Sequence, residues 1–548
     1  MSRSFLPAGA PHTEVTGMPA AHRPWLTLSI LCAGFFMALL DGSIVNIAVP
    51  SLIADIHASY DEVLWMIDAY LLVFSTLLIT TGKLGDIFGY RRLFLTGVSI
   101  FTMASVLCGL SASPGQLLAA RILQGIGAAL LFPQVISSIL VTFPPPMRGR
   151  AFGVFGAIAG FAPIIGPVLG GLVLAHLTWR WIFFINAPIG VMILVLALVF
   201  IPDLRPSRTH RIDLGGVALV TAGLSCIVFG LIEGRRYGWG KIGGPIGITS
   251  LIATGVMLLL LFIIWQRVQR GEPLMPWELF TSERNFPSGN WIGFVFQFGM
   301  IGISLVLVLY LQMARGFSPL RTGLVLLPNA ALTAVGSAFA GRVSDRVGGR
   351  LVLMTGLAAL SVGLAVLALT AGADSGVRHL LPGLLIIGLA SGATFAPLQQ
   401  VTMDHVDTRL AGAASGVANT TRQIGGVMGT AVMGVLLSTR LNSALRHEAR
   451  KHAGELPPQL RAQFIDTATT NGHRFSPPPP PHDLPPAETS LLTHLGQKTF
   501  AAAYTTAMQT TLLTSAAILA AAALFCLTLK PQTRKRPSPE KTTTKTKH

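Results

Sequence analysis

The feature that most constrains this chain is a series of long apolar segments along nearly its whole length. A helix needs about 20 mostly apolar residues to cross a bilayer, and inside the hydrocarbon it satisfies its own backbone hydrogen bonds. The sequence therefore predicts an all-α membrane protein with 14 spanning helices. The predicted spans are 25–48, 64–82, 93–111, 116–140, 151–174, 181–201, 213–233, 246–265, 289–313, 322–341, 351–371, 380–402, 411–437 and 504–528.

The scarcity of charge supports this interpretation. Only 11% of the 548 residues are charged, whereas a soluble domain carries about 25%, so membrane lipid is predicted to cover much of the exterior. The formal charge of +17 does not indicate a nucleic-acid partner, because the basic residues lie between the apolar segments. In a membrane protein that distribution is an orientation signal.

The basic residues predict the topology. With the N-terminus inside, the cytoplasmic tails and loops hold 24 Lys and Arg and the outer segments hold 14, seven of them in one long connection. The positive-inside rule then places both termini in the cytoplasm and the protein in the plasma membrane, in a bacterium the inner membrane. Residues 1–24 form a cytoplasmic tail rather than a cleavable signal, and 529–548 form a disordered basic tail.

A repeated loop motif predicts an internal duplication. Its members recur at a constant offset of 259 residues: Gly82, Asp86, Gly89 and Arg91 match Gly341, Asp345, Gly348 and Arg350. Two six-helix bundles, 25–201 and 289–528, explain the repeat. Residues 202–288 are then an inserted two-helix hairpin with linkers. Residues 438–503 form an extracytoplasmic loop that contains the polyproline stretch Pro477–Pro481.

We interpret the two loops, including Arg92, as conformational gates. Each follows a predicted helix at the cytoplasmic side, where its Asp and Arg can form a charge network with helix ends. Such a network holds one conformation and breaks in another. A simple positive-inside anchor would account for the arginines, but not for the repeated glycine and aspartate positions.

Three ionisable residues inside predicted spans are candidate functional groups, because charge is costly in a membrane. Asp41, Asp68 and Arg121 all fall in the outer half of the N-terminal bundle. We interpret Asp41 as the main proton-coupling carboxylate and Arg121 as the group that organises the carboxylates. The alternatives are a backbone hydrogen bond for Asp41, a hydrated rim position for Asp68, and helix packing for Arg121.

Five motifs together resemble the major facilitator superfamily, and within it the multidrug-efflux subfamily of drug:proton antiporters with 14 spanning helices. Ser43 stands where Thr is common in that subfamily, and the second gating loop carries Ser344. The resemblance covers about residues 25–528 and implies the major facilitator fold. The motifs are Leu40–Pro50, Gly82–Arg92, Leu118–Gly127, Gly156–Gly171 and Trp179–Gly190.

The fourth motif resembles the helix that distinguishes antiporters in this superfamily. Its GxxxG pairs allow a close approach to a helix of the other half, and its prolines bend it. It is predicted to seal one face of the transport cavity, with ordinary close packing as the alternative. Its members are Gly156, Gly160, Pro163, Gly166, Pro167, Gly170 and Gly171.

Amide, aromatic and thioether side chains are predicted to line the cavity, although an ordinary packed interior explains them equally well. These residues are Asn46, Phe132, Gln134, Phe395, Gln399, Gln400 and Met403. Arg422 lies mid-span, where a structural role is expected. The four isolated cysteines and the absence of HExxH or GxxxxGK[ST] motifs predict no metal site, no cofactor and no enzyme activity.

The resemblance implies a proton-coupled exporter of drugs or lipophilic natural products that works by alternating access. Its partners are a small-molecule substrate and protons, with no obligate protein partner. Trp65, Asp68 and Tyr70 fit a pattern found in members that handle cationic drugs, so the substrate is often a cation. The alternatives are import or exchange of a metabolite or, from another class, a polytopic membrane receptor or enzyme.

Overall fold

The computed structural model describes residues 24–530, except 49–50, 53–54, 57–59, 203–212, 235–236, 244–245, 270–272, 282–284, 374, 405 and 471–485. The predicted tails, 1–23 and 531–548, and the polyproline stretch lie outside the described residues. Almost every other described segment is helical, as the apolar sequence predicts. Each of the 14 predicted spans overlaps a helix.

In the described residues, the N-terminal half and the first part of the inserted segment comprise nine α-helices, a short 3-10 helix and a two-stranded hairpin. In chain order these are α1 (Pro24–Ile44), η1 (Val45–Ala48), α3 (Tyr60–Phe88), α4 (Tyr90–Leu110), α5 (Pro114–Thr142), α6 (Pro145–His176), α7 (Trp181–Phe184), α8 (Asn186–Phe200), α9 (Leu214–Glu233), β1 (Lys241–Gly243), β2 (Ile246–Gly247) and α10 (Ile248–Val268).

The C-terminal half follows a short helix that ends the inserted segment. That short helix is α11 (Glu278–Thr281). The described elements of the C-terminal half are α12 (Asn285–Leu309), η2 (Tyr310–Ala314), α13 (Pro319–Val347), α14 (Gly349–Thr370), α15 (Val377–Met403), η3 (Thr408–Leu410), α16 (Ala411–Ala453), α17 (Pro458–Thr470), α18 (Pro486–Phe525) and η5 (Cys526–Thr528).

The length and hydropathy of these helices show an integral membrane protein. Among the described residues, 12 helical segments are long and apolar enough to cross a bilayer. The helices α6, with 32 residues, and α12, with 25, are comparably long but are not among those 12. The described structure therefore supports 12 to 14 spanning helices.

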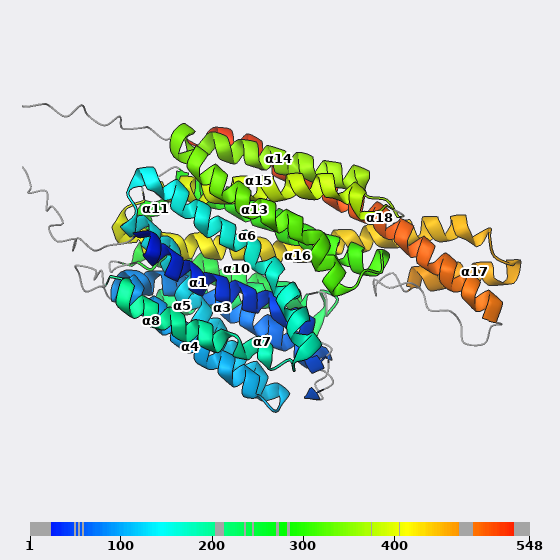
Figure 1. Ribbon diagram of the computed structural model, residues 1–548, viewed down its shortest axis with the longest axis horizontal. Coiled ribbons are helices and arrows are strands. Elements are labelled where there is room, and N and C mark those ends of the chain that lie inside the picture. The colour runs from blue at the N-terminus through cyan, green and yellow to red at the C-terminus, as the bar shows by residue number, and fades with distance from the viewer. Residues whose placement is uncertain are drawn as a thin grey trace, which may run out of the picture.

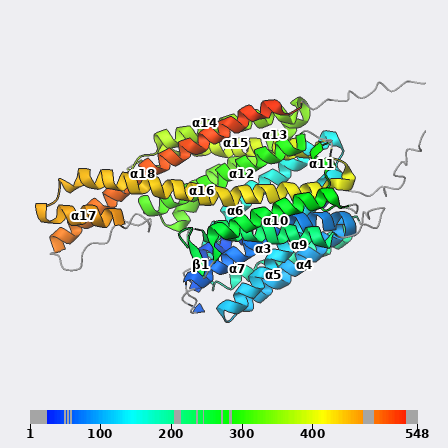
Figure 2. The same ribbon diagram turned by 180° about the vertical axis from the view of Figure 1, so that it is seen from behind.

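Two hydrophobic cores divide the bundle. One gathers buried side chains mainly from α1, α3, α4, α5, α6 and α8, and the other from α12 to α16 and α18. The helices α6 and α13 run side by side between the two halves, and α16 packs against α3 behind them (Figures 1 and 2). Helix α1 begins and helix α18 ends at the same end of the bundle (Figure 1). We call this end, near Pro24 and Phe525, the terminal end.

The inserted segment forms a helical hairpin against the junction of the halves. Helices α9 and α10 pack together, and α9 also contacts α3 and α16. Its base is tied by Asp213, whose carboxylate accepts hydrogen bonds from the Gly216 backbone N–H and the side chains of Trp265, Gln266 and Gln269. Although partial burial raises the pKa of Asp213, these donors hold it below its ordinary value.

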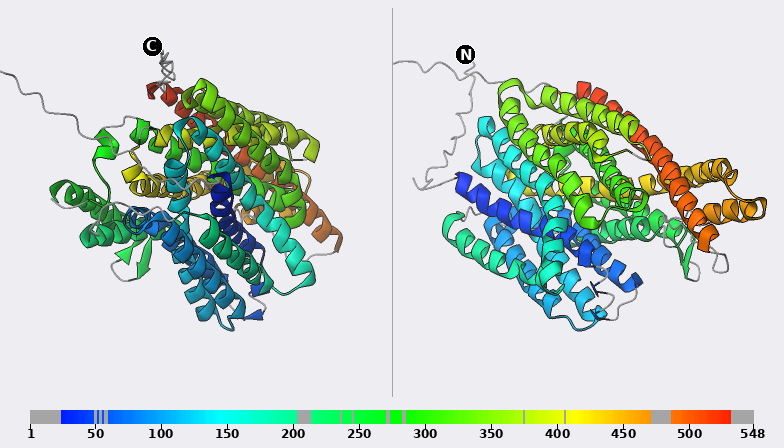
Figure 3. Two further views of the ribbon diagram at one scale, coloured as in Figure 1. Left: turned by 60° about the vertical axis from the view of Figure 1, so that its left-hand side comes forward. Right: turned by 45° about the vertical axis from the view of Figure 1, so that its right-hand side comes forward.

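The described residues of the connection 438–503, predicted as an extracytoplasmic loop, are largely helical. Helix α16 continues far past the predicted end of its span, and α17 and the first turns of α18 pack on that extension, which projects beyond the bundle (Figure 3). Phe464 and Leu495 are buried in its small core with Ala449 and Leu456. The prediction missed these helices because their mean hydropathy is far below that of a span, although their spacing still buries one apolar face.

Candidate functional site

Asp41 and Arg121 form an ion pair in the interior of the N-terminal half. Arg121 Nη1 lies 2.6 Å from Asp41 Oδ2, and both side chains are at most 1% exposed. Asp41 lies near the end of α1 and Arg121 on α5, so only the packing of these helices brings them together. The predicted meeting of these two residues is therefore observed, with each charge balanced by the other.

Two amide side chains complete this cluster. Gln124 Nε2 and Asn186 Nδ2 both donate to Asp41 Oδ1, over 2.8 and 3.0 Å. Gln124 also accepts from Arg121 Nη1, and Asn186 donates to Ser105 Oγ. Sequence reasoning placed both amides inside motifs but did not assign them to the site. The sequence did contain a signal for Gln124, because this amide follows Arg121 by three residues within a predicted span.

An aromatic ring and a backbone carbonyl support the guanidinium of Arg121. The ring of Tyr70 lies 4.3 Å from it, in cation–π geometry. The Met66 carbonyl accepts from Arg121 Nε over 3.3 Å. Asp68 lies between these two residues in the sequence and is half-buried on α3. Trp65 lies one turn before Asp68 and packs near Phe229 of the inserted hairpin, with the two ring centroids 5.3 Å apart.

At the terminal end, Asp86 links the two halves. Its carboxylate accepts hydrogen bonds from the backbone N–H groups of Gly412 and Ala413, over 2.7 and 2.8 Å, and from Tyr90. Gly412 and Ala413 open α16 in the C-terminal half, where the helix dipole attracts an anion. Glycine is required here, because a Cβ on Gly82 would lie 2.4 Å from the Gly412 carbonyl oxygen.

Asp345 makes the reciprocal link. Its carboxylate accepts from the N–H groups of Gly149 and Arg150, over 2.9 and 3.1 Å, in the first turns of α6 of the N-terminal half. Gln400 also donates to Asp345, and Ser344 donates to Gln400. The repeated motif therefore joins each half to a helix start of the other, and we call these two contacts the Asp86 link and the Asp345 link.

The motif residues sit differently from the prediction. Gly82, Asp86, Gly341 and Asp345 lie in the last turns of α3 and α13 rather than in loops. The turns themselves are Gly89 and Gly348, with φ of 91° and 95°, a region that glycine adopts without strain.

The motif arginines start the next helices and contact their own half. Arg91 donates to the Leu198 carbonyl and Arg350 to the Leu527 carbonyl. Arg92 is exposed on α4. In the described hydrogen bonds, the carboxylates of the motif contact helix starts, whereas Arg91 and Arg350 contact backbone carbonyl groups.

The glycines of α6 pack against both halves. A Cβ on Gly156 would lie 2.3 Å from Ser337 Oγ of α13, and one on Gly160 would lie 2.2 Å from Thr333 Cγ2 of the same helix. Gly166 instead faces Ser43 of the N-terminal half, and Gly171 has open space around it. Gly170 is buried, and the side chains of Pro163 and Pro167 lie outside the described structure.

Comparisons with known proteins identify the family of this chain. The family model described as Major Facilitator Superfamily matches residues 31–430. The chain belongs to this superfamily. It is 33% identical to the "Tetracenomycin C resistance and export protein" of Streptomyces glaucescens over 96% of each chain. It is 36% identical to the "Probable actinorhodin transporter" of Streptomyces coelicolor over 85% of this chain and 81% of that one.

A solved structure shares the major facilitator fold at low sequence identity. The proton:xylose symporter XylE bound to 6-bromo-6-deoxy-D-glucose superposes with a TM-score of 0.55 at 13% identity, over 82% of this chain and 94% of that chain. This likeness bears on the fold alone. Together with the family match it confirms the predicted all-α major facilitator fold. The family match and the named relatives show a transporter rather than an enzyme.

The predicted cavity residues of this major facilitator protein fall into different environments. Gln134 is fully buried and donates to the Thr81 carbonyl, which joins α5 to α3, and Gln400 belongs to the Asp345 link. Phe132, Gln399 and Met403 are buried by neighbouring helices. Phe395 is half-buried between Phe155 and Phe296. The side chain of Asn46 lies outside the described structure.

Arg422 of α16, for which a structural role is predicted, makes one hydrogen bond among the described residues. Its guanidinium lies 5.3 Å from the Phe395 ring, and its Nη2 donates to Asn419 on the same helix. Nη1 is buried without a hydrogen-bond partner among the described residues. Arg422 thus has one amide and one ring as neighbours, where Arg121 has a carboxylate.

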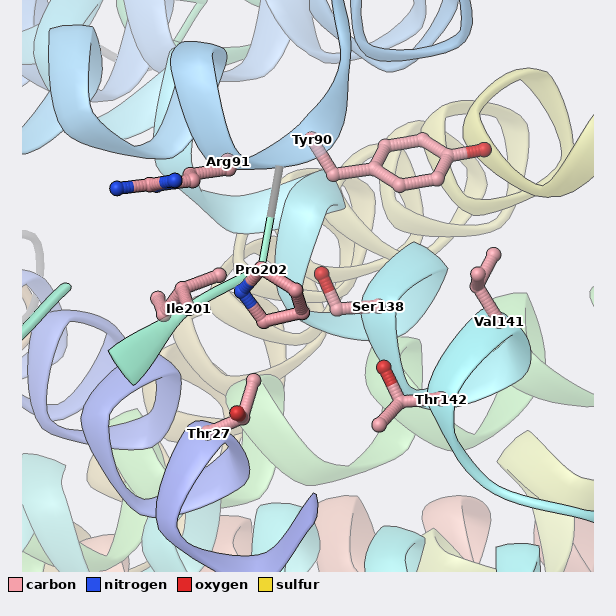
Figure 4. A pocket seen from close by; sticks show the side chains of 8 residues that line it. All are labelled: Thr27, Tyr90, Arg91, Ser138, Val141, Thr142, Ile201 and Pro202. Carbon is pink, nitrogen blue, oxygen red and sulfur yellow. The ribbon is translucent and has the colours of Figure 1, made fainter. Parts of the chain in front are cut away.

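A small pocket lies near the terminal end of the N-terminal half (Figure 4). Tyr90 and Arg91 line it from α4, Ser138 and Val141 from α5, and Pro202 from the segment after α8. The described residues contain no group of three or more His, Cys, Asp or Glu that could hold a metal ion.

Proposed function

We propose that this protein is a proton-coupled antiporter that exports antibiotics or other drug-like natural products by alternating access. Export is supported by the names of its relatives, which describe transport of actinorhodin and resistance to and export of tetracenomycin C. Coupling is supported by one observation, the buried cluster of Asp41, Arg121, Gln124 and Asn186. No bound cofactor is required, because the proton gradient supplies the drive.

The cluster contains what a membrane proton site needs. Proton binding to Asp41 removes its negative charge and breaks the ion pair with Arg121. A protonated carboxyl also needs an acceptor for its O–H. Asn186 Oδ1 is a buried acceptor without a hydrogen-bond partner among the described residues, and rotation of its amide brings that oxygen to Asp41. Protonation therefore exchanges one set of contacts for another and biases the conformation.

The Asp86 link and the Asp345 link are the contacts that form in one conformation of the transport cycle and break in the other. In this structure they tie the halves together at the terminal end, which we propose to be cytoplasmic, so the conformation is closed to the cytoplasm. Opening toward the cytoplasm requires both carboxylates to leave the helix starts that they contact. Each link consists of hydrogen bonds to a charged acceptor, worth about 1.5–3 kcal/mol apiece, so the two states can be close in free energy.

The proposed topology has 14 crossings, with both termini in the cytoplasm of a bacterial cell and α6 and α12 among the spanning helices. The six-helix halves are 25–201 and 289–528, and residues 202–288 form the inserted hairpin. Reporter fusions after residues 234 and 454 test it. An enzyme active only outside the membrane should be active at both positions and inactive when fused to the C-terminus.

The coupling proposal is tested in everted membrane vesicles that hold an acidic interior. Addition of tetracenomycin C should release protons from vesicles that contain the protein, read as recovery of a quenched pH-gradient dye. Asp41→Asn should abolish this release at equal protein level. Asp407→Asn is the matched control, because Asp407 is an exposed aspartate that binds Arg409 outside the core.

Three outcomes decide between the alternatives. Release by wild type and by Asp407→Asn, but not by Asp41→Asn, supports antiport. Proton entry into the vesicles together with the drug, read as further quenching of the dye, would identify a symporter. Equal release by Asp41→Asn and wild type removes Asp41 from the coupling mechanism.

A further inference from the structure

Arg422 lies near the middle of the membrane, beside the junction of the two halves. It is the twelfth residue of α16, about 16 Å from the helix start at 1.5 Å per residue, and the hydrocarbon core is about 30 Å thick. Phe395, which lies under its guanidinium, contacts Phe155 of α6 at 5.8 Å between ring centroids. The arginine of one half is therefore one ring away from the other half.

The polar atoms around Arg422 are unsatisfied donors. Arg422 Nη1 and Asn419 Nδ2 are both buried without a hydrogen-bond partner among the described residues. Asn419 Oδ1 already accepts from Arg422 Nη2. The pair consequently presents N–H groups and one positive charge, and the chemical complement of that set is an acceptor with negative charge.

Aromatic rings connect this pair to the Asp41 cluster. Each ring in the series contacts the next, with centroids 4.4 to 6.2 Å apart, from beneath Arg422 to beneath Arg121. The series is Phe395, Phe155, Phe35, Phe132, Phe74 and Tyr70. An apolar or aromatic body beside Arg422 would therefore meet rings from both halves.

We propose that Arg422 and Asn419 bind the anionic group of the transported substrate, a carboxylate or phenolate carried on an aromatic body that packs against Phe395 and Phe155. The assignment rests on the proposed function, because it names the substrate class of that same transporter. It opposes the preference for cations that the sequence predicts from Asp68. The carboxylate of Asp41 is already neutralised by Arg121 in this structure, whereas the charge of Arg422 repels a cation.

Two xanthene dyes of similar shape and opposite charge test the proposal. Fluorescein is an aromatic anion and rhodamine 123 an aromatic cation. Binding to the purified full-length protein in detergent is measured by fluorescence anisotropy, which needs no proton gradient. Fluorescein should bind at least about tenfold more tightly than rhodamine 123, since one charge-assisted hydrogen bond accounts for that ratio.

Variants then test the residue itself. Arg422→Gln should weaken fluorescein binding about tenfold or more and leave rhodamine 123 binding unchanged or tighter. Arg422→Lys, which keeps the charge, should retain the preference for fluorescein. Arg440→Gln is the control, because Arg440 is exposed further along the same helix. Thermal unfolding of each variant checks that the protein is folded.

The outcomes separate this inference from the proposed function. Equal binding of both dyes to wild type, no binding of fluorescein, or equal loss of both dyes in Arg422→Gln would overturn the anion site. The expected binding pattern without gradient-driven export would keep the anion site and overturn the proposed antiport. Gradient-driven export of both dyes at equal rates would keep antiport and overturn the anion site.

Discussion

The two halves of the protein each hold an arginine within a long helix, and the surroundings of the two arginines differ. Arg121 meets a carboxylate 2.6 Å away, two further oxygen acceptors and a tyrosine ring. Arg422 meets an asparagine of its own helix and a phenylalanine ring. A membrane interior keeps a charge at low free energy only when a counter-charge is near. The first arginine is thus internally balanced, and the second has no carboxylate partner among the described residues.

The largest effect on stability is expected when Arg121, whose charge is balanced by Asp41, is replaced. Arg121→Met leaves Asp41 as a lone buried carboxylate, and breaking a buried pair on one side costs about 3–5 kcal/mol. We expect a large fall in the midpoint of thermal unfolding of the purified protein. The double variant Arg121→Met with Asp41→Asn should recover most of this loss without recovering export. A single variant as stable as wild type would contradict the balanced pair.

The aspartate links extend the comparison to the terminal end. Asp86→Asn removes a charged acceptor from the start of α16 and should weaken closure by about 1.5–3 kcal/mol. Asp345→Asn should weaken it less, because Asp345 is nearer to solvent and Arg150 and Gln400 remain beside it. Spin labels on α3 and α16, measured as pulsed-resonance distances, report the opened population. Equal opening in both variants would show that burial does not set the strength of the link.

Replacement of Arg422 should change the unfolding stability in the opposite direction from replacement of Arg121. Arg422→Met removes a buried charge that has no carboxylate partner among the described residues, and should raise unfolding stability by about 1–3 kcal/mol. The same thermal measurement as for Arg121 checks it, without added ligand. If Arg422→Met lowered the midpoint as much as Arg121→Met does, the contrast between the halves would be wrong.

The smallest effect is expected where α6 crosses between the halves. A valine at Gly160 would collide with Thr333, and overpacking of this kind costs about 1–3 kcal/mol. Because Thr333 Cγ2 ends a side chain that can rotate, we expect the lower part of that range. Gly171→Val is the matched control in the same helix, since nothing lies within 4 Å of its position. The export rate is measured for both variants. Equal changes would show that the close packing of α6 on α13 does not seal the transport cavity.

Much of the fold follows from the sequence because helix formation in a membrane is local. An apolar run such as 351–371 closes its own backbone hydrogen bonds wherever it lies, so α14 could be predicted without knowledge of its neighbours. The 259-residue repeat similarly indicated two equivalent positions, but not that each carboxylate contacts a helix start of the other half. The extension of α16 could not be predicted in this way. It is stabilised by contacts with α17 and α18 that its own composition does not show.

The sequence by itself determined that this chain crosses a membrane, that it repeats, and that Asp41 and Arg121 are costly residues in need of a role. Only the tertiary structure decided which charges meet. Asp41 and Arg121 are 80 positions apart and Asp86 and Gly412 are 326 apart, so helix packing alone sets their distances. The same packing pairs Arg121 and leaves Arg422 without a carboxylate among the described residues, because a buried charge is satisfied by its neighbours in space.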